Sequence, residues 1–270
     1  MAAVTRIRVT AVTHRGLIRA GNEDCLGWNG WSCAGGAPAP FRLDLDITRR
    51  TVIVVCDGMG GHAGGVEAGR MACELLTDPL APETADPAAD PATAIRALLQ
   101  RVSDTLNDTA AARPELAGMG CTVAGLAIEP DGTALVFNVG DSRAYRREGR
   151  YLAQLTVDHR RPGSNRLVQA LGGGRRLILT PDFFTCPLPA APGILLCTDG
   201  LDDYAEPAAV EAAALTETGD PVPRLRDLAL AAGGGDNVTI VGVETLTPAV
   251  GSGTAAGARH DRPTDSGVSR

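Results

Sequence analysis

Residues 121–156 constrain the fold most, because they form a run of short strands with almost no sequence between them. The run reads "CTVAGLAIEPDGTALVFNVGDSRAYRREGRYLAQLT". Asp131-Gly132 and Glu148-Gly149 provide tight turns between the apolar stretches, which predicts two hairpins. Strands joined by such turns are antiparallel. A chain with this run at its centre cannot be a doubly wound parallel sheet throughout.

The segments around this run are clusters of strands and clusters of helices. We expect strands over residues 4–12, 51–57, 193–199 and 237–245. Helices are expected over Val66–Thr77, over a long amphipathic segment from Ile95 to Leu106, and in Ala-rich stretches between Pro207 and Ala232, with a connector over Pro79–Pro91. This grouping, without strict strand–helix alternation, favours an α+β sandwich.

The composition indicates a globular protein of the cytoplasm. No apolar run approaches the roughly 20 residues that span a bilayer, and the first residues scatter arginines where a signal peptide requires an apolar segment. The seven cysteines include no C-x-x-C pair, so we expect reduced, buried thiols and neither disulfides nor a zinc site. Residues 247–270 lack large apolar side chains, which predicts a disordered tail.

Charge and the choice of basic residues exclude several functions. The net charge of −7 disfavours nucleic acid as a partner. All 25 basic residues are arginine. The absence of lysine excludes a Walker phosphate loop, a protein-kinase active site and a Schiff-base enzyme, because each requires a lysine amine.

The stretch "VIVVCDGMGGHAGG", residues 52–65, has two interpretations. Gly58–Ala63 fits a dinucleotide-binding G-x-G-x-x-A pattern between a strand and a helix. However, Asp57 would face the pyrophosphate, and Asp78, about 20 residues on, follows a helix and not a second strand. We therefore favour the second interpretation, in which Asp57 itself is the functional group at a strand end.

Aspartates close or open an apolar strand beside glycine at four places, namely Asp57, Asp141, Asp199 and Asp236. A single Asp-Gly pair is ordinary turn chemistry. Four of them suggest carboxylates that converge, and converging carboxylates repel one another unless a cation neutralises them. Because the set contains only oxygen ligands, Mg²⁺ or Mn²⁺ is favoured over zinc.

These residues resemble the metal-dependent serine/threonine phosphatases (PPM, or type 2C, phosphatases), in particular the bacterial branch. The resemblance rests on a series of short motifs, in the family's order, over residues 14–240. They are "RGLIRAGNED", "CDGMGGHAGG", "GCTV", "NVGDSRAY", "LTVDH", "ALGG", "CTDGLDD" and "GGGDNVT".

The resemblance implies a four-layer αββα sandwich, with two stacked antiparallel sheets flanked by helices, over a catalytic domain of residues 1–246. It also implies two Mg²⁺ or Mn²⁺ ions per site. Asp57 would bridge them, the Gly58 carbonyl would bind one, and Asp199 and Asp236 the other. Glu23 and Asp24 would hold metal-bound waters. Arg19 would bind the substrate phosphate. Asp141, Asp199 and Asp203 match a weaker third-metal site.

The activity implied is hydrolysis of phosphoserine and phosphothreonine in proteins, by direct attack of a hydroxide shared between the two metals. The partners would be phosphorylated proteins, the substrates of a Ser/Thr kinase. We expect a monomer that binds neither nucleic acid nor membrane. Two alternatives remain: a regulatory pseudophosphatase, and a phosphatase of another phosphoester.

The chain departs from the family pattern in two segments. A flap that follows the LTxDH element in many members is reduced here to a few residues after Asp158-His159. A long insertion between the first motif and Asp57 contains both tryptophans, which predicts either a surface hairpin or a partner-binding surface. We further expect His159 to fix a turn, Arg143 to pair with carboxylates, and Asn237 to fix the Asp236 loop.

Overall fold

Two antiparallel sheets form the centre of the computed structural model, which describes residues 5–86 and 88–246. The first sheet has the order β13-β9-β8-β5-β2-β3 and the second β11-β10-β14-β15-β1-β4. The strands of the first are β13 (Asp182–Pro187), β9 (Thr133–Val139), β8 (Val123–Ile128), β5 (Thr51–Cys56), β2 (Cys25–Trp28) and β3 (Trp31–Ala34). Those of the second are β11 (Tyr151–Gln154), β10 (Arg143–Glu148), β14 (Ile194–Cys197), β15 (Val238–Thr245), β1 (Thr5–His14) and β4 (Ala37–Ile47).

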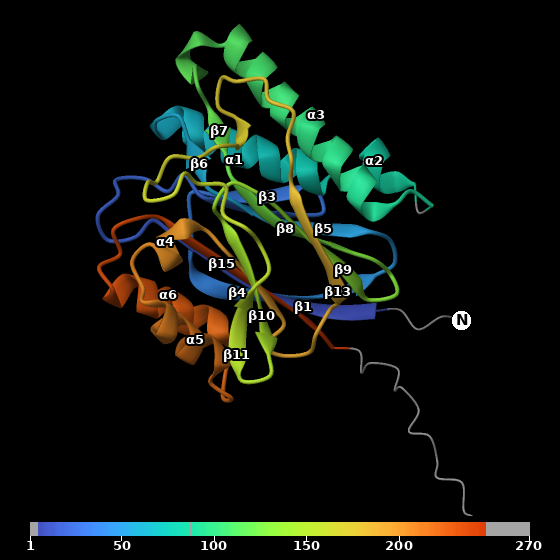
Figure 1. Ribbon diagram of the computed structural model, residues 1–270, viewed down its shortest axis with the longest axis vertical. Coiled ribbons are helices and arrows are strands. Elements are labelled where there is room, and N and C mark those ends of the chain that lie inside the picture. Colours follow the sequence, from blue (N-terminus) through green and yellow to red (C-terminus); the bar gives the residue numbers. More distant parts are fainter. Residues whose placement is uncertain (1–4, 87, 247–270) are drawn as a thin grey trace, which may run out of the picture.

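Helices cover the outer face of each sheet (Figure 1). Helices α1 (His62–Thr77) and α3 (Pro91–Ala112) lie on the first sheet, and α5 (Pro207–Leu215) and α6 (Pro221–Ala231) lie on the second. The short elements are α2 (Pro82–Ala85), a 3-10 turn (Pro114–Leu116) and α4 (Asp199–Asp202), and a small sheet of β12 (Leu171–Gly172), β7 (Gly120–Cys121) and β6 (Gly58–Met59). The predicted α+β sandwich with four layers is confirmed.

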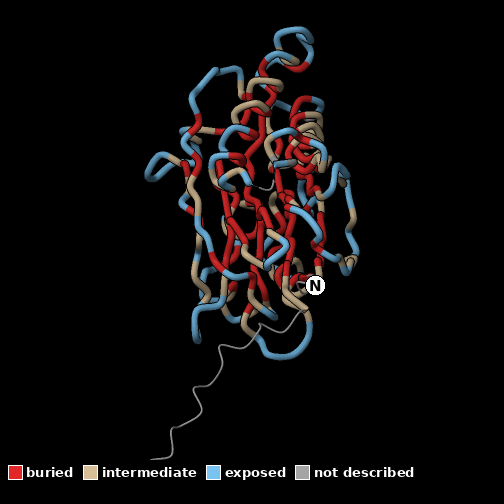
Figure 2. The backbone as a smooth tube through the Cα atoms, turned by 90° about the vertical axis from the view of Figure 1, so that its right-hand side faces the viewer, coloured by how far each residue is buried: buried red, intermediate tan, exposed pale blue. Residues whose placement is uncertain are grey.

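Three hydrophobic clusters correspond to the three interfaces between these layers. One lies between the first sheet and α1 and α3, one between the two sheets, and one between the second sheet and the C-terminal helices. Strand β5 is buried from Val52 to Cys56 because it contributes to two of these clusters, one on each face. Figure 2 shows the buried backbone running through the middle of the molecule, with exposed segments at its periphery.

Most elements lie where the sequence predicted them, and the exceptions have local causes. Helix α1 begins at His62 and not Val66, because its first turn contains two glycines and no periodic apolar residue. The Pro79–Pro91 connector includes the short helix α2. Strand β4 was not predicted, although residues 41–47 alternate apolar and charged side chains, as expected of an edge strand with one solvent face. Residues 247–270, the predicted tail, lie outside the described residues.

The two tryptophans lie on the β2–β3 hairpin. Asn29 and Gly30 form its turn with φ of 49° and 74°, the left-handed conformation that two-residue hairpin turns require. The rings of Trp28 and Trp31 are 4.2 Å apart, and Trp31 is 46% exposed while Trp28 is half-buried. The insertion therefore begins with a surface hairpin, the first of the two expectations, with Trp28 half-buried and Trp31 exposed.

Candidate metal centre

The predicted metal-binding residues meet at one end of the sandwich. Asp57 lies between β5 of the first sheet and β6, Asp199 begins α4 directly after β14, and Asp236 lies just before β15. Because β14 and β15 are antiparallel, with Cys197 opposite Ile240, the end of one strand adjoins the start of the other. Figure 1 shows β6 and α4 at this same end of the molecule, on its left. The site therefore draws ligands from both sheets.

Glycine is needed beside two of these aspartates because another backbone segment passes close by. A Cβ atom on Gly58 would lie 2.2 Å from the Gly65 carbonyl oxygen, and one on Gly200 would lie 1.8 Å from the Asn237 carbonyl oxygen. Any larger residue would move these backbones apart. The Asp-Gly pattern therefore serves the close approach of the segments that carry Asp57, Asp199 and Asp236.

Burial and mutual repulsion raise the pKa values of Asp57, Asp24 and Asp199. The pKa of Asp57 is held well above its usual range by burial and by the charges of Asp24 and Asp199. Burial raises the pKa of Asp24 to about 8, and burial together with Asp141 and other carboxylates raises that of Asp199 to about 7. Such a cluster is stabilised by cations that neutralise it.

The donor set fits small divalent cations that keep part of their water shell. The cluster offers carboxylate oxygens, and among the described residues no group of three or more His, Cys, Asp or Glu side chains is arranged so that it could hold a metal ion as it stands. Mg²⁺ is commonly bound through one or two carboxylates and several waters. An open arrangement of oxygen ligands on two sheets matches that preference, whereas a closed tetrahedral zinc site would require converging nitrogen or sulfur ligands.

Glu23 and Asp24 reach the cluster from the segment before β2. Asp24 is 1% exposed, and its Oδ2 accepts hydrogen bonds of 2.8 Å from the hydroxyls of Thr198 and Thr239. The Glu23 carboxylate lies against helix α1, where a Cβ on Gly65 would be 1.9 Å from its Oε2. Both predicted residues are therefore part of the cluster, and sequence reasoning missed the two threonines that orient Asp24.

Arg19 extends to the cluster from the exposed segment after β1. Its Nη2 lies 2.6 Å from Oδ2 of Asp236, and its side chain is 53% exposed. Exposed ion pairs contribute little stability, so the guanidinium can exchange this contact for an anionic ligand at small cost. Asp141 and Asp203, the remaining predicted ligands, are also brought together, but around the side chain of Arg160.

Asn237 holds the segment that carries Arg19 and Glu23 onto the start of β15. Its Nδ2 donates to the carbonyls of Arg15 and Gly21, at 2.9 and 2.8 Å, and its Oδ1 accepts from the Glu23 amide at 2.8 Å. Its own amide donates to Oδ1 of Asp236. The predicted role of Asn237 is confirmed, and the side chain also fixes the opposite wall of the site.

Replacing Asn237 by alanine is expected to lower the free energy of unfolding by about 2–4 kcal/mol, because a buried side chain with three hydrogen bonds is lost. Urea denaturation would measure the change. Asn165→Ala, at an exposed position, is the control and is expected to stay within about 0.5 kcal/mol of the wild type. Equal stability of the two variants would contradict this assignment.

The raised carboxyl pKa values also predict how the metal-free protein responds to pH. Asp24 and Asp199 hold protons in the folded state up to about pH 8 and 7, whereas in the unfolded chain they lose them near pH 4. The folded state therefore binds more protons in this interval, and stability falls as pH rises. In EDTA, the melting temperature is expected to decrease between about pH 6.5 and 8.5, above the range in which most histidines titrate. An increase would contradict the prediction.

Three other predictions from the sequence have clear outcomes. Arg143 pairs with Asp158 at 2.7 Å and lies 3.4 Å from Asp202, as expected of a residue that pairs with carboxylates. His159 fixes a turn, since its Nδ1 accepts from the Gly140 amide at 3.0 Å and its Nε2 lies 2.8 Å from Asp182. Arg160 was missed, because nothing in the local pattern marks it as different from the neighbouring Arg161.

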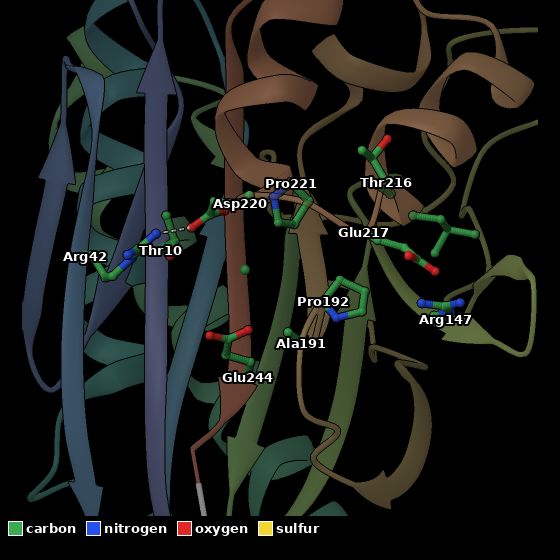
Figure 3. Close-up of a pocket in the computed structure, with 14 residues that line it drawn as sticks. Thr10, Arg42, Arg147, Ala191, Pro192, Thr216, Glu217, Asp220, Pro221 and Glu244 are labelled. Atoms are coloured by element: carbon green, nitrogen blue, oxygen red, sulfur yellow. Dashed lines mark hydrogen bonds and ion pairs between the residues drawn. The ribbon is translucent and has the colours of Figure 1, made fainter.

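A pocket of about 390 Å³ lies apart from this centre, between the outer face of the second sheet and the turn that joins α5 to α6 (Figure 3). Its walls include Arg42, which pairs with Asp220 at 2.9 Å across one side, and Glu244. Of the described residues that line it, none belongs to the predicted metal centre. Its charged groups do not converge on one point in the manner of the carboxylates above.

Comparison with known proteins identifies a consistent set of relatives. Residues 44–228 match the family model described as Protein phosphatase 2C. The serine/threonine protein phosphatase PstP of Mycobacterium tuberculosis is 30% identical over 262 residues, which cover 89% of this chain and 46% of that protein. The serine/threonine phosphatase stp of Listeria monocytogenes is 31% identical over 255 residues, which cover 86% of this chain and 93% of that protein.

The structural comparison agrees with the sequence comparison. The catalytic domain of PstP in complex with two manganese ions superposes with a TM-score of 0.68 at 27% identity, covering 90% of this chain and all of that domain. The present chain thus spans about half the length of the mycobacterial relative. Among the described residues, no helix is both long and apolar enough to cross a membrane.

Proposed function

The chain belongs to the protein phosphatase 2C family, and we propose that it is a metal-dependent phosphatase that hydrolyses phosphoserine and phosphothreonine in proteins. One observation supports this most strongly. Asp57, Asp199 and Asp236 converge from two sheets into one cluster, and burial and neighbouring carboxylates raise the pKa values of Asp57 and Asp199. A cluster of this kind requires cations, and a phosphate ester is the substrate that such cations polarise.

The residues of the cluster divide by their position. Asp57, between β5 and β6, would hold both of two Mn²⁺ or Mg²⁺ ions. The Gly58 carbonyl would bind one of them, and Asp199 and Asp236 would bind the other. Glu23 and Asp24 lie behind this set and would hold water molecules of the ions. Two manganese ions in the PstP catalytic domain are consistent with this number.

The chain's own groups bind and orient the substrate phosphate. When bound, the cations supply a water of lowered pKa and neutralise charge that develops on the phosphoryl oxygens. Arg19 extends from an exposed segment toward Asp236, where its planar fork can bind two phosphate oxygens. Nucleophilic attack by a cysteine beside the cluster is disfavoured, because the Cys56 and Cys121 thiols are both fully buried. Direct hydrolysis by water is therefore the mechanism we propose.

The substrates, the opposing enzyme, the oligomeric state and the cellular location follow from the same proposal. We propose phosphorylated proteins as substrates, with a Ser/Thr kinase as the opposing enzyme, and a monomer as the working form. A cytoplasmic location fits the cysteines, all seven of which are free thiols, as is usual in a reducing compartment.

A second candidate is a phosphatase of another phosphoester. Between His159 and Leu171 the chain forms no helix or strand apart from the isolated bridge of Arg160 with Leu167, so the flap predicted to be shortened is an irregular loop, and its residues 165–170 line a pocket of about 290 Å³ together with Met59. A regulatory pseudophosphatase is less well supported, because it would require a damaged ligand set and all the carboxylates are present.

A panel of substrates separates the two active candidates. The purified protein with Mn²⁺ would be assayed on matched phosphoserine, phosphothreonine and phosphotyrosine peptides and on phosphorylated sugars and nucleotides. The proposal predicts the highest kcat/KM on the phosphoserine and phosphothreonine peptides. Preference for a small phosphoester by tenfold or more would favour the second candidate.

A further inference from the structure

Arg160 occupies the centre of the three carboxylates that the family resemblance assigns to a weaker third metal. Its Nε lies 2.5 Å from Oδ2 of Asp141, and its two terminal nitrogens lie 2.9 Å from Oδ1 of Asp203. Asp199, which also belongs to the main cluster, lies 3.8 Å from Nη2. One guanidinium therefore contacts all three carboxylates.

The backbone beside Arg160 is fixed in a way that directs its side chain to this place. The His159 amide donates to the Gly140 carbonyl at 2.9 Å, and the Gly140 amide donates back to Nδ1 of His159 at 3.0 Å. Gly140 directly precedes Asp141. The reciprocal pair therefore places residue 160 beside Asp141, and it does so within a segment too short to fold over the cleft.

Burial distinguishes this arginine from Arg19. The Arg160 side chain is 14% exposed, whereas that of Arg19 is 53% exposed. Withdrawing this mostly buried guanidinium would leave Asp141 and its neighbours without a counter-charge where little water reaches them, whereas water readily replaces an exposed ion pair. A divalent cation entering between these three carboxylates would have to displace Arg160 or accept repulsion from it at contact distance.

We propose that the Arg160 guanidinium takes the place of a third divalent cation among Asp141, Asp199 and Asp203, so that the site binds two divalent cations and no third. The residues do not fit a third ion, because the position between them holds a fixed positive charge. Its two terminal nitrogens donate to Asp203, whereas Nε has no hydrogen-bond partner and contacts Asp141 as an ion pair only. Arg160 thereby supplies the positive charge that these carboxylates would otherwise take from a third ion.

This inference rests on the proposed function, because it requires two cations at Asp57, Asp199 and Asp236. It is tested by counting Mn²⁺ ions per chain at saturation, with native mass spectrometry and equilibrium dialysis. The wild type is expected to bind two. Arg160→Ala is expected to bind three, and the double variant Arg160→Ala/Asp141→Asn to return to two, because Asp141 contributes only to the third position.

Two controls separate this effect from a general change of charge or stability. Arg161→Ala removes the same charge at the next, exposed residue and is expected to bind two ions. Arg160→Lys retains a charge and is expected to bind two. If Arg160→Ala does not fold, Arg160→Gln provides a neutral side chain of similar length.

The outcomes are distinct. Three ions on the wild type, or two on a folded neutral variant at position 160, would overturn the inference and leave the proposed function intact. A wild type that binds no Mn²⁺ would overturn both the inference and the proposed function.

Discussion

Asp57→Asn is expected to lower metal-dependent phosphatase activity by about a thousandfold or more while leaving the metal-free protein folded. Asp57, which directly follows β5, is the carboxylate that would contact both cations. Loss of the several kcal/mol that metals supply to the transition state corresponds to this factor. Asparagine has the shape of a protonated aspartic acid. Because burial and neighbouring carboxylates already raise the pKa of Asp57, the substitution removes a repulsive charge from the metal-free cluster.

For the same variant we expect activity to fall but the stability of the metal-free protein not to fall. In EDTA its melting temperature is expected to equal or exceed that of the wild type, and added Mn²⁺ is expected to raise it less, because ligand binding to the folded state stabilises in proportion to affinity. Asp46→Asn, at an exposed position on β4, is the matched control and should behave as the wild type. Retained activity in Asp57→Asn would contradict the assignment, and unfolding in EDTA would contradict the electrostatic account.

Gly200→Ala is expected to disrupt both stability and activity. The added Cβ would lie 1.8 Å from the Asn237 carbonyl oxygen and 2.8 Å from its carbonyl carbon. Both are backbone atoms at the start of β15, so no side-chain rotation relieves the overlap. We expect a loss of about 1–3 kcal/mol in unfolding free energy from overpacking. Activity should fall about a hundredfold, because α4 and its Asp199 move away from Asp236.

Gly64→Ala is the comparison variant for this prediction. Gly64 lies in α1, where its Cβ would be 3.4 Å from Cβ of Met119, an ordinary contact. Gly64 lies in the first turn of α1, where replacing glycine by alanine reduces the freedom of the unfolded chain and is favourable by about 0.4–1 kcal/mol. This variant should therefore be as stable as the wild type or more so, and chemical denaturation of both variants would test the pair. Equal effects of the two substitutions would contradict the close-approach role of Gly200.

The sequence predicted the sandwich and the carboxylate cluster because both are encoded locally. Period-two apolar segments and Asp-Gly turns identify the strands of residues 121–156, and the aspartates at 57, 199 and 236 adjoin strand ends that the fold brings together. The local pattern does not predict which side chains from segments distant in sequence form hydrogen bonds with one another. Thr198 and Thr239 bond Asp24 across 174 and 215 residues, and nothing in their own surroundings indicates this.

Arg160 is a second example of a residue whose contacts in the site could not be predicted from the sequence. Its sequence neighbours predict a turn. Because Arg160 stands beside a second arginine, the sequence does not indicate which of the two enters the site. Only the folded chain reveals that the reciprocal bonds between His159 and Gly140 place it among three carboxylates. The expectation of a third cation came from the resemblance of the motifs to the family, and the motifs do not report which position a neighbouring side chain fills.

Hydrolysis of p-nitrophenyl phosphate by the purified protein, with EDTA or with millimolar Mn²⁺, tests the central claim most directly, with Asp236→Asn measured beside the wild type. The account predicts turnover by the wild type only with Mn²⁺, and its loss in the variant. Turnover that persists in EDTA, or that survives in Asp236→Asn, would contradict a phosphatase site built on these carboxylates and their cations.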